Sequence, residues 1–127
     1  MGYGDELRAC GFDVLHIPFA REIEPLVDFR CAAALFATLR RHRFDIVHSH
    51  NPKGGLLGPV IARLAQVPLV VHTVHGFLFN ENSRGLHDLL AHCAERWTAA
   101  WSEQLLFQSA EDYEYARAKN YKEMHAL

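Results

Sequence analysis

Two short hydrophobic segments that end in histidines constrain the fold of this chain more than any other feature. Residues 45–50 read Asp-Ile-Val-His-Ser-His, and residues 68–75 read Pro-Leu-Val-Val-His-Thr-Val-His. The span between them has the length of one helix, and β-branched residues favour strands. The pattern predicts two parallel strands joined by a helix. Their polar residues gather at the carboxyl ends, the edge at which open parallel sheets bind ligands.

The same alternation of strand and helix runs along the whole chain. We expect strands over residues 12–18, 44–50, 68–74 and 104–108, and helices over residues 29–42, 54–65, 86–101 and 110–118. A first helix ends near Gly11, a polar loop over residues 20–28 holds Pro25, and Ser109 with Asp112 forms a capping box for the last helix. This order predicts an α/β fold: a three-layer, Rossmann-like domain with a parallel sheet covered on both faces.

Composition limits the class of protein. The 127 residues suffice for one domain, and half of them are hydrophobic, so a core can form. The formal charge of -2 gives no basic excess of the kind that nucleic-acid binders show. No apolar stretch approaches the ~20 residues that span a bilayer, and the start lacks the apolar core of a signal peptide. We therefore expect a cytoplasmic protein.

The three cysteines, Cys10, Cys31 and Cys93, are widely spaced and odd in number. They fit neither a disulfide framework nor a zinc cluster. We expect buried thiols in a reducing compartment.

The histidines of the two strands divide between the faces of the predicted sheet. His48 and His50 share one face while Ser49 points the other way, and His72 and His75 fall on opposite faces. His48 and His72 are more typical of core histidines that hydrogen-bond backbone groups. His50 and His75 lie at the strand exits, where ligand binding is the favoured interpretation.

A metal site is the main alternative for these four histidines. His-x-His is a real metal spacing, but a catalytic zinc needs three converging protein ligands. Here the candidates come in pairs on different faces, and the one acid within the strands, Asp45, lies at the far end. We predict no metal, and a metal-dependent hydrolase remains as an alternative.

The turn over residues 51–55, Asn-Pro-Lys-Gly-Gly, leads into a helix. Its backbone N–H groups and the helix dipole suit an anion. Lys53 precedes the glycines, so the turn is neither a Walker loop nor a dinucleotide-binding turn. Alternatively, Gly54, Gly55 and Gly58 let the helix pack closely on the sheet, and both interpretations stay open.

A basic cluster, Arg40, Arg41 and Arg43, ends the helix over residues 29–42. Cations at this position suit the negative pole of a helix dipole, which is the favoured interpretation. Contact with anionic lipid is the alternative.

Three motifs in order resemble a known family. They are His-Asn-Pro-Lys-Gly-Gly-Leu-Leu-Gly at 50–58, His-Thr-Val-His-Gly-Phe at 72–77 with Glu81 shortly after, and Leu-Leu-Phe-Gln-Ser-Ala-Glu-Asp at 105–112. Together they resemble the N-terminal domain of bacterial family-four glycosyltransferases. These are GT-B enzymes that build capsule, exopolysaccharide and lipopolysaccharide chains. The resemblance covers about residues 7–115.

The resemblance implies a two-domain enzyme that moves a sugar from a nucleotide-sugar donor to a glycan or lipid-linked acceptor, without cofactor or metal. The N-terminal domain of such enzymes mainly holds the acceptor, and the C-terminal domain binds the nucleotide. His75 matches the family histidine that faces the transferred sugar and is the expected catalytic residue. The expected substrate-binding residues are His50, Asn51, Lys53, Gly54, Gly55, Gly76 and Phe77.

Set beside this family, the chain is expected to lack the first strand with its glycine-rich loop and the donor domain. The segment after Tyr115 is expected to depart from the family pattern. We therefore expect residues 1–127 to be an N-terminal domain that is incomplete at both ends and inactive alone. The alternative is a non-catalytic half-enzyme or binding module that needs a separate donor domain. Peripheral contact with the inner face of the membrane is a further expectation, and a nucleic-acid partner is not expected.

Overall fold

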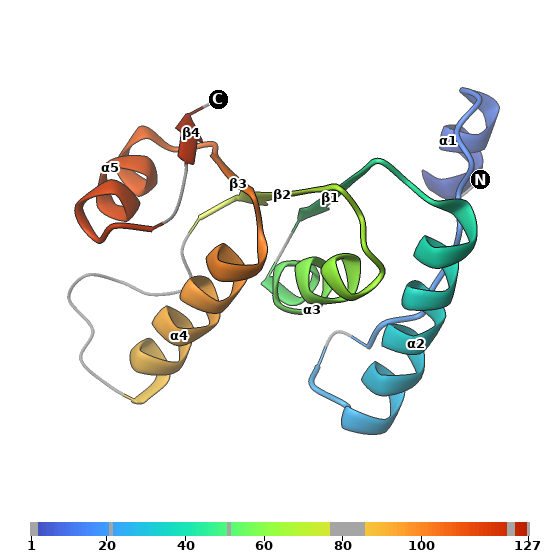
Figure 1. Cartoon of the computed structure of the whole chain (residues 1–127), viewed down its shortest axis with the longest axis horizontal. Coiled ribbons are helices and arrows are strands. Elements are labelled where there is room, and N and C mark those ends of the chain that lie inside the picture. The colour runs from blue at the N-terminus through green and yellow to red at the C-terminus, as the bar shows by residue number, and fades with distance from the viewer. Residues whose placement is uncertain (1–2, 21, 51, 77–85, 122–123, 127) are drawn as a thin grey trace.

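The computed structural model describes residues 3–20, 22–50, 52–76, 86–121 and 124–126. Helices and strands alternate along most of the chain (Figure 1). The helices are α1 (Tyr3–Ala9), α2 (Pro25–His42), α3 (Pro52–Leu64), α4 (Leu86–Trp101) and α5 (Ala110–Ala118). The strands are β1 (Ile46–His50), β2 (Leu69–Val74), β3 (Gln104–Phe107) and β4 (Met124–Ala126).

The four strands form one parallel sheet in the sequential order β1-β2-β3-β4. In its register Ser49 lies opposite His72, and His72 lies opposite Leu105. Helix α3 contacts β1 and β2, α4 contacts β2, and α5 contacts β3 and β4. The α/β class and the parallel, Rossmann-like sheet are therefore confirmed.

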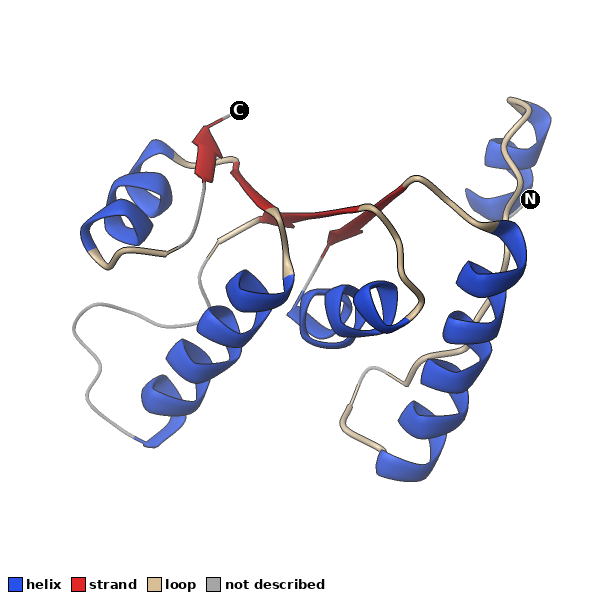
Figure 2. Ribbon diagram, viewed as in Figure 1, coloured by secondary structure: helices blue, strands red, loops and turns tan. Residues whose placement is uncertain are grey.

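The helices that pack on the sheet lie on one side of it. Figure 2 shows α3 and α4 together below the strands. Connections between parallel strands are right-handed, so strands in sequential order place their connecting helices on the same face. The second helical layer of the expected three-layer arrangement is not formed by the described elements.

Two hydrophobic cores hold the helices to this face. The first joins α2, α3 and the start of β2 through Leu39, Ile61, Ala62, Ala65, Val67 and Val70. The second joins β2, β3, α4 and α5 through Val74, Ala99, Leu105, Phe107, Ala116 and Tyr121. Since side chains alternate along a strand, the cores fix which residues of β1–β3 point away from the helices.

One carboxylate ties the turn between α4 and β3 to the start of β2. The N–H of Glu103 donates to Val70 O over 2.8 Å, and Glu103 Oε2 accepts from the N–H of Val70 over 2.8 Å. Glu103 Oε1 also pairs with the guanidinium of Arg63 at the end of α3. Both backbone groups of Val70 are thus satisfied beyond the end of the β2–β3 ladder.

The segment before α2 differs from the prediction. Residues 12–18 form no strand; Arg8 Nη2 donates to Val14 O over 3.1 Å, and Cys31 Sγ to Pro18 O over 3.3 Å. Helix α2 begins at Pro25 rather than Phe29, because proline suits the first helical turn, where its missing N–H costs nothing. The expected loop over residues 20–28 is therefore shorter.

Among the other local predictions, the two helix caps are confirmed and the burial of the cysteines is only partly correct. Gly11 follows α1 with a φ of 89°, and Ser109 Oγ accepts from the N–H of Asp112 over 3.3 Å, both as predicted. Cys31 is buried, but Cys10 and Cys93 are exposed, so the expectation of buried thiols is wrong for these two. No helix in the described parts of the chain is both long and apolar enough to cross a bilayer.

Candidate functional site

Three neighbouring strands each supply one polar side chain at their carboxyl ends. His50 ends β1, His75 directly follows β2, and Gln108 directly follows β3. His50 Nδ1 lies 3.1 Å from His75 Nε2, and His75 Nδ1 lies 3.0 Å from Gln108 Oε1. All three residues are exposed. The two histidines expected to bind ligand are thus joined in one hydrogen-bonded row.

His48 lies beside the hydrogen-bonded row, next to His50. Its ring centroid lies 4.1 Å from that of His50, and its Nε2 lies 2.7 Å from Thr73 Oγ1 on β2. His48 is exposed and bonds a hydroxyl, so its expected place in the core, bonded to backbone, is wrong.

His72 lies on the other face, under α3. It is buried, and its Nδ1 lies 2.8 Å from the hydroxyl of buried Ser49. A Cβ atom added to Gly55 would lie 2.4 Å from His72 Cε1, so glycine is required for α3 to approach β2. This contact supports the packing interpretation of the glycines. His72 is a core histidine as predicted, although it bonds a side chain rather than backbone.

Burial and the charges of neighbouring histidines keep the imidazoles of His50 and His72 neutral. The pKa of His50 is lowered, first by burial and then by the charges of His48 and His75. The pKa of His72 is lowered to about 4 by burial and by the charges of His50, His48 and His75, against a smaller opposing effect of Ser49. Both rings are therefore uncharged near pH 7, and each offers one N–H and one lone pair.

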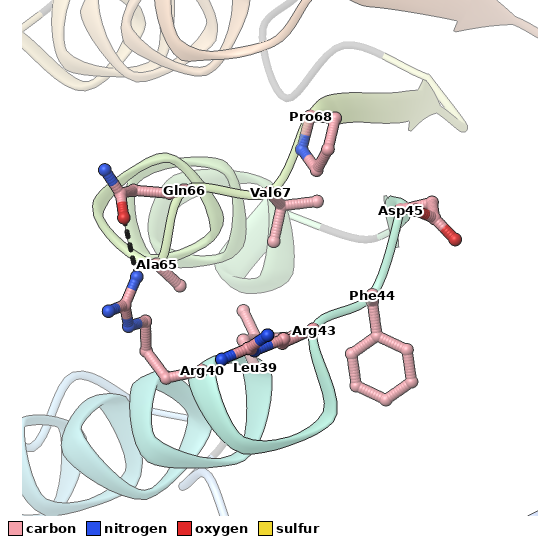
Figure 3. A pocket seen from close by; sticks show the side chains of 9 residues that line it. All are labelled: Leu39, Arg40, Arg43, Phe44, Asp45, Ala65, Gln66, Val67 and Pro68. Carbon is pink, nitrogen blue, oxygen red and sulfur yellow. Dashed lines mark hydrogen bonds between the residues drawn. The ribbon is translucent and has the colours of Figure 1, made fainter.

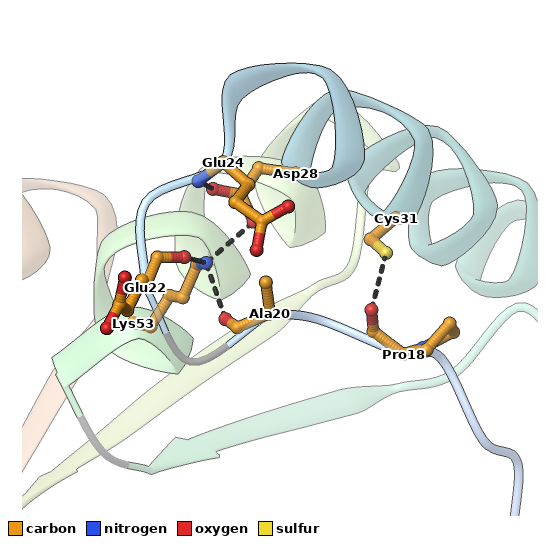
Figure 4. Close-up of polar contacts among 7 residues, drawn as sticks. All are labelled: Pro18, Ala20, Glu22, Glu24, Asp28, Cys31 and Lys53. Carbon is orange, nitrogen blue, oxygen red and sulfur yellow. Dashed lines mark hydrogen bonds and ion pairs between the residues drawn. The ribbon is translucent and has the colours of Figure 1, made fainter.

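Lys53 is directed toward the N-terminal loop (Figure 4). Its Nζ lies 2.7 Å from Asp28 Oδ1, 2.6 Å from Ala20 O and 2.5 Å from Glu22 O. An ammonium has three donors, and these three oxygens take them up. The contact fastens the loop and the start of α2 to α3. Substrate binding by Lys53 stays a prediction, one that requires this contact to open.

The ion pair also affects Asp28. The pKa of its carboxyl is lowered, mainly by Lys53 and further by the N–H of Glu24, against an opposing effect of burial. Asp28 Oδ2 accepts from that N–H over 3.0 Å at the start of α2.

The remaining predicted residues lie around the row or outside the described chain. Gly76 follows His75 with a φ of 139°, a conformation that favours glycine. Gly54 is exposed on the first turn of α3. Asn51 and Phe77 lie outside the described residues.

Thr73 and Gln108 were not predicted from the sequence as residues of the site. The signal for Gln108 was its position: it follows β3 as His75 follows β2, and Val74 lies opposite Phe107 in the register.

A pocket of about 430 Å³ lies at the opposite edge of the sheet, where β1 and β2 begin (Figure 3). Arg40 and Arg43 line it, and Arg40 Nη1 donates to Gln66 Oε1 over 2.6 Å. Helices α2 and α3 both end here, so two negative dipole ends face the arginines. The helix ends offset part of the charge of Arg40 and Arg43, and both interpretations of the basic cluster stay open.

Among the residues described, no group of three or more His, Cys, Asp or Glu side chains has a geometry that could hold a metal ion.

Comparison with known proteins gives the family. Residues 2–126 match the model of the glycosyl transferase 4-like domain. The UDP-Gal:alpha-D-GlcNAc-diphosphoundecaprenol alpha-1,3-galactosyltransferase of Escherichia coli is 39% identical over 94 residues, which are 74% of this chain and 24% of the relative. The putative glycosyltransferase EpsD of Bacillus subtilis is 29% identical over 109 residues, 84% of this chain and 26% of the relative.

A third relative is the capsular polysaccharide biosynthesis glycosyltransferase CapM of Staphylococcus aureus, 31% identical over 74 residues, 58% of this chain and 20% of the relative. The chain therefore spans about a quarter or less of the length of these relatives.

The family match extends to residue 126, so the prediction that the segment after Tyr115 departs from the family is wrong. That segment completes α5 and then adds β4 beside β3, a strand of three residues that is too short to give a clear sequence pattern. The match covers nearly the whole chain, and the predicted fold and motifs agree with it. The chain belongs to the glycosyl transferase 4-like family.

Proposed function

We propose that this chain is the acceptor-side domain of a glycosyltransferase in surface polysaccharide synthesis. The enzyme transfers a sugar from a nucleotide-sugar donor to a glycan or lipid-linked acceptor. The observation that carries the proposal is the His50–His75 hydrogen bond at the carboxyl edge of β1 and β2. The relatives support it, since their names include a diphosphoundecaprenol-linked acceptor and capsular polysaccharide synthesis.

The electrostatics of the site suit this chemistry. Breaking a glycosyl–phosphate bond places positive charge on the sugar and negative charge on the leaving diphosphate. Fixed dipoles that match these charges lower the barrier. A neutral His50 can hydrogen-bond a sugar hydroxyl without placing a cation beside the positive sugar. The lowered pKa of His50 supports this role.

The proposal assigns the nucleotide to a separate C-terminal domain. The chain spans 24% of the E. coli relative, so a full enzyme of that length has room for such a domain. We propose that residues 1–127 alone do not transfer sugar and that the enzyme acts in the cytoplasm.

Contact with the inner face of the membrane is part of the same proposal. The exposed residues Arg40, Arg41 and Arg43 are the surface that we assign to anionic lipid. Sedimentation of the chain with phosphatidylglycerol vesicles tests it. Substitution of Arg41 and Arg43 by glutamine should reduce binding, and equal binding by the variant would contradict the assignment.

A chimeric enzyme tests the catalytic role of His75. The matching segment of the E. coli galactosyltransferase is replaced by this domain, and galactose transfer from UDP-Gal to the lipid-linked acceptor is measured. We expect His75→Ala to lower kcat by ~10²–10³, the usual effect of removing one preorganised group. The matched control is His16→Ala, an exposed histidine before α2, which should leave kcat unchanged. A higher KM with unchanged kcat would favour the binding-module alternative.

A further inference from the structure

We propose that Gln108 is a positioning residue that fixes the tautomer of His75 and, through it, that of His50. The three side chains form one row across three strands, with 3.0 Å between Gln108 Oε1 and His75 Nδ1 and 3.1 Å between His75 Nε2 and His50 Nδ1. His75 has one ring nitrogen toward Gln108 and the other toward His50, and His50 has one toward His75 and the other toward solvent. The position of the proton on one ring therefore determines its position on the next.

The arrangement follows from counting protons. A neutral imidazole has one N–H and one lone pair, and a carbonyl oxygen only accepts. Because Gln108 Oε1 faces His75, the proton of His75 lies on Nδ1 and its Nε2 carries the lone pair. His75 Nε2 then accepts from the N–H at His50 Nδ1. Both rings are protonated on Nδ1, and the lone pair of the row ends on His50 Nε2.

The orientation of one amide thus selects the polarity of the row. If the Gln108 amide nitrogen faced His75, both rings would be protonated on Nε2, and His50 would present a donor instead of an acceptor. His50 is exposed, and its Nε2 has no partner among the residues that the structure describes. The oxygen-facing orientation therefore presents an acceptor to solvent.

The environment of His50 supports a neutral ring at that position. The titratable groups around it are His48 and His75, and His72 lies on the other face of the sheet. Partial burial, and then the charges of His48 and His75, lower the pKa of His50, so the ring does not gain a second proton near pH 7. His48 bonds Thr73 separately, and its ring lies against that of His50 at an interplanar angle of 41°, which limits the movement of the His50 ring.

The role of Gln108 in catalysis rests on the proposed function, whereas the tautomers do not. In the enzyme, His50 Nε2 accepts a hydrogen bond from a hydroxyl group of a sugar. Without Gln108, both tautomers of His75 become accessible, and His50 presents an acceptor only part of the time.

Tautomers are measured directly on the 127-residue chain. Long-range 1H–15N correlation spectra at pH 7.5, without any sugar, distinguish a protonated Nδ1 from a protonated Nε2. The variants are Gln108→Glu, whose carboxylate only accepts, and Gln108→Met, which has a similar length but makes no such bond. Gln66→Met at the opposite edge of the sheet is the matched control.

We expect His75 and His50 to be protonated on Nδ1 in the unchanged chain, in Gln66→Met and in Gln108→Glu. Gln108→Met should lose the Nδ1–H preference of both rings. The proposal is overturned if His75 is protonated on Nε2 in the unchanged chain, or if Gln108→Met leaves both tautomers as they were. If Gln108→Met fails to fold, loss of the Nδ1–H form in folded Gln108→Glu overturns it equally. In the chimeric enzyme, Gln108→Met that changes both tautomers but leaves sugar transfer unchanged would contradict the proposed role of the row in catalysis and leave the tautomer assignment intact.

Discussion

The buried imidazole of His72 links the stability of the domain to pH. Its pKa falls from 6.5 in an unfolded chain to about 4 in the fold, mainly because of burial. Below pH 6.5 the unfolded state therefore binds a proton that the folded state does not, and the free energy of unfolding falls as the pH is lowered toward 4. The shift corresponds to a loss of about 3 kcal/mol, complete below pH 4.

Urea unfolding of the chain and of His72→Asn, at pH values from 7.5 to 4.5, measures this loss. Glu95, whose pKa is raised to about 7 by burial and by Asp112, changes stability in the opposite direction over an overlapping range. The difference in the free energy of unfolding between the chain and the variant, taken at each pH, gives the contribution of His72. We expect the variant to lose less stability on acidification, and parallel pH profiles would contradict the account.

The faces of the histidines were predictable because side chains alternate along a strand. That rule placed His48 with His50, and His72 opposite His75, as the structure has them. The direction of Lys53 was not predictable, because its partner Asp28 lies on another helix and a long flexible side chain reaches many positions. The contact between Gln108 and His75 was not predictable either, because it depends on the register between β2 and β3.

At the level of elements, the approach of α3 to the sheet depends on its glycines. A Cβ added at Gly55 would lie 2.4 Å from the His72 ring, one at Gly58 would lie 3.3 Å from Ser49 Cβ, and one at Gly54 meets nothing within 4 Å. We expect Gly55→Ala to destabilise the domain by ~1–3 kcal/mol, as overpacked cores do. Gly58→Ala should cost less.

Gly54→Ala is the matched control for this series. Alanine is the better helix former by up to ~1 kcal/mol, so this variant should be neutral or slightly stabilising. The melting temperatures of the three variants give the order of their stabilities. Equal melting temperatures for Gly54→Ala and Gly55→Ala would show that α3 does not need the close approach.

The contact between Lys53 and Asp28 joins two elements and predicts a titration shift. Lys53 is the largest cause of the lowered pKa of Asp28. We expect Lys53→Met to raise that pKa toward its ordinary value, measured from the carboxyl carbon shift during an NMR titration. Lys119→Met, which changes an exposed lysine at the end of α5, should leave it unchanged. An unshifted Asp28 in Lys53→Met would mean that the ion pair does not persist in solution.

Periodic elements were predictable, and the segment before α2 was not. Residues 12–18 have a strand-like composition, but a strand also needs a neighbour to pair with, and none of the described residues pairs with them. Pro25 was interpreted as a loop residue, whereas it begins α2. A proline is compatible with both, and only packing of the following turn distinguishes them.

For the whole molecule, the exposed side of the sheet predicts low stability. Ile46 in β1 is 57% exposed, although parallel sheets are normally covered on both faces. We expect the isolated chain to melt broadly at a low temperature. We also expect no sugar transfer or hydrolysis with any of a panel of nucleotide sugars, because the proposal assigns the nucleotide to another domain. A sharp cooperative transition together with turnover would contradict both expectations.

The sequential strand order has a consequence for synthesis on the ribosome. Each strand pairs with the one made just before it: Ser49 meets His72, and His72 meets Leu105. The sheet can therefore grow from its first strand outward as the chain emerges, without waiting for a distant partner. Domains generally fold as units during elongation, and nearby contacts close faster than distant ones. A nascent chain halted after β2 and α4 should already protect the β1–β2 amides from exchange.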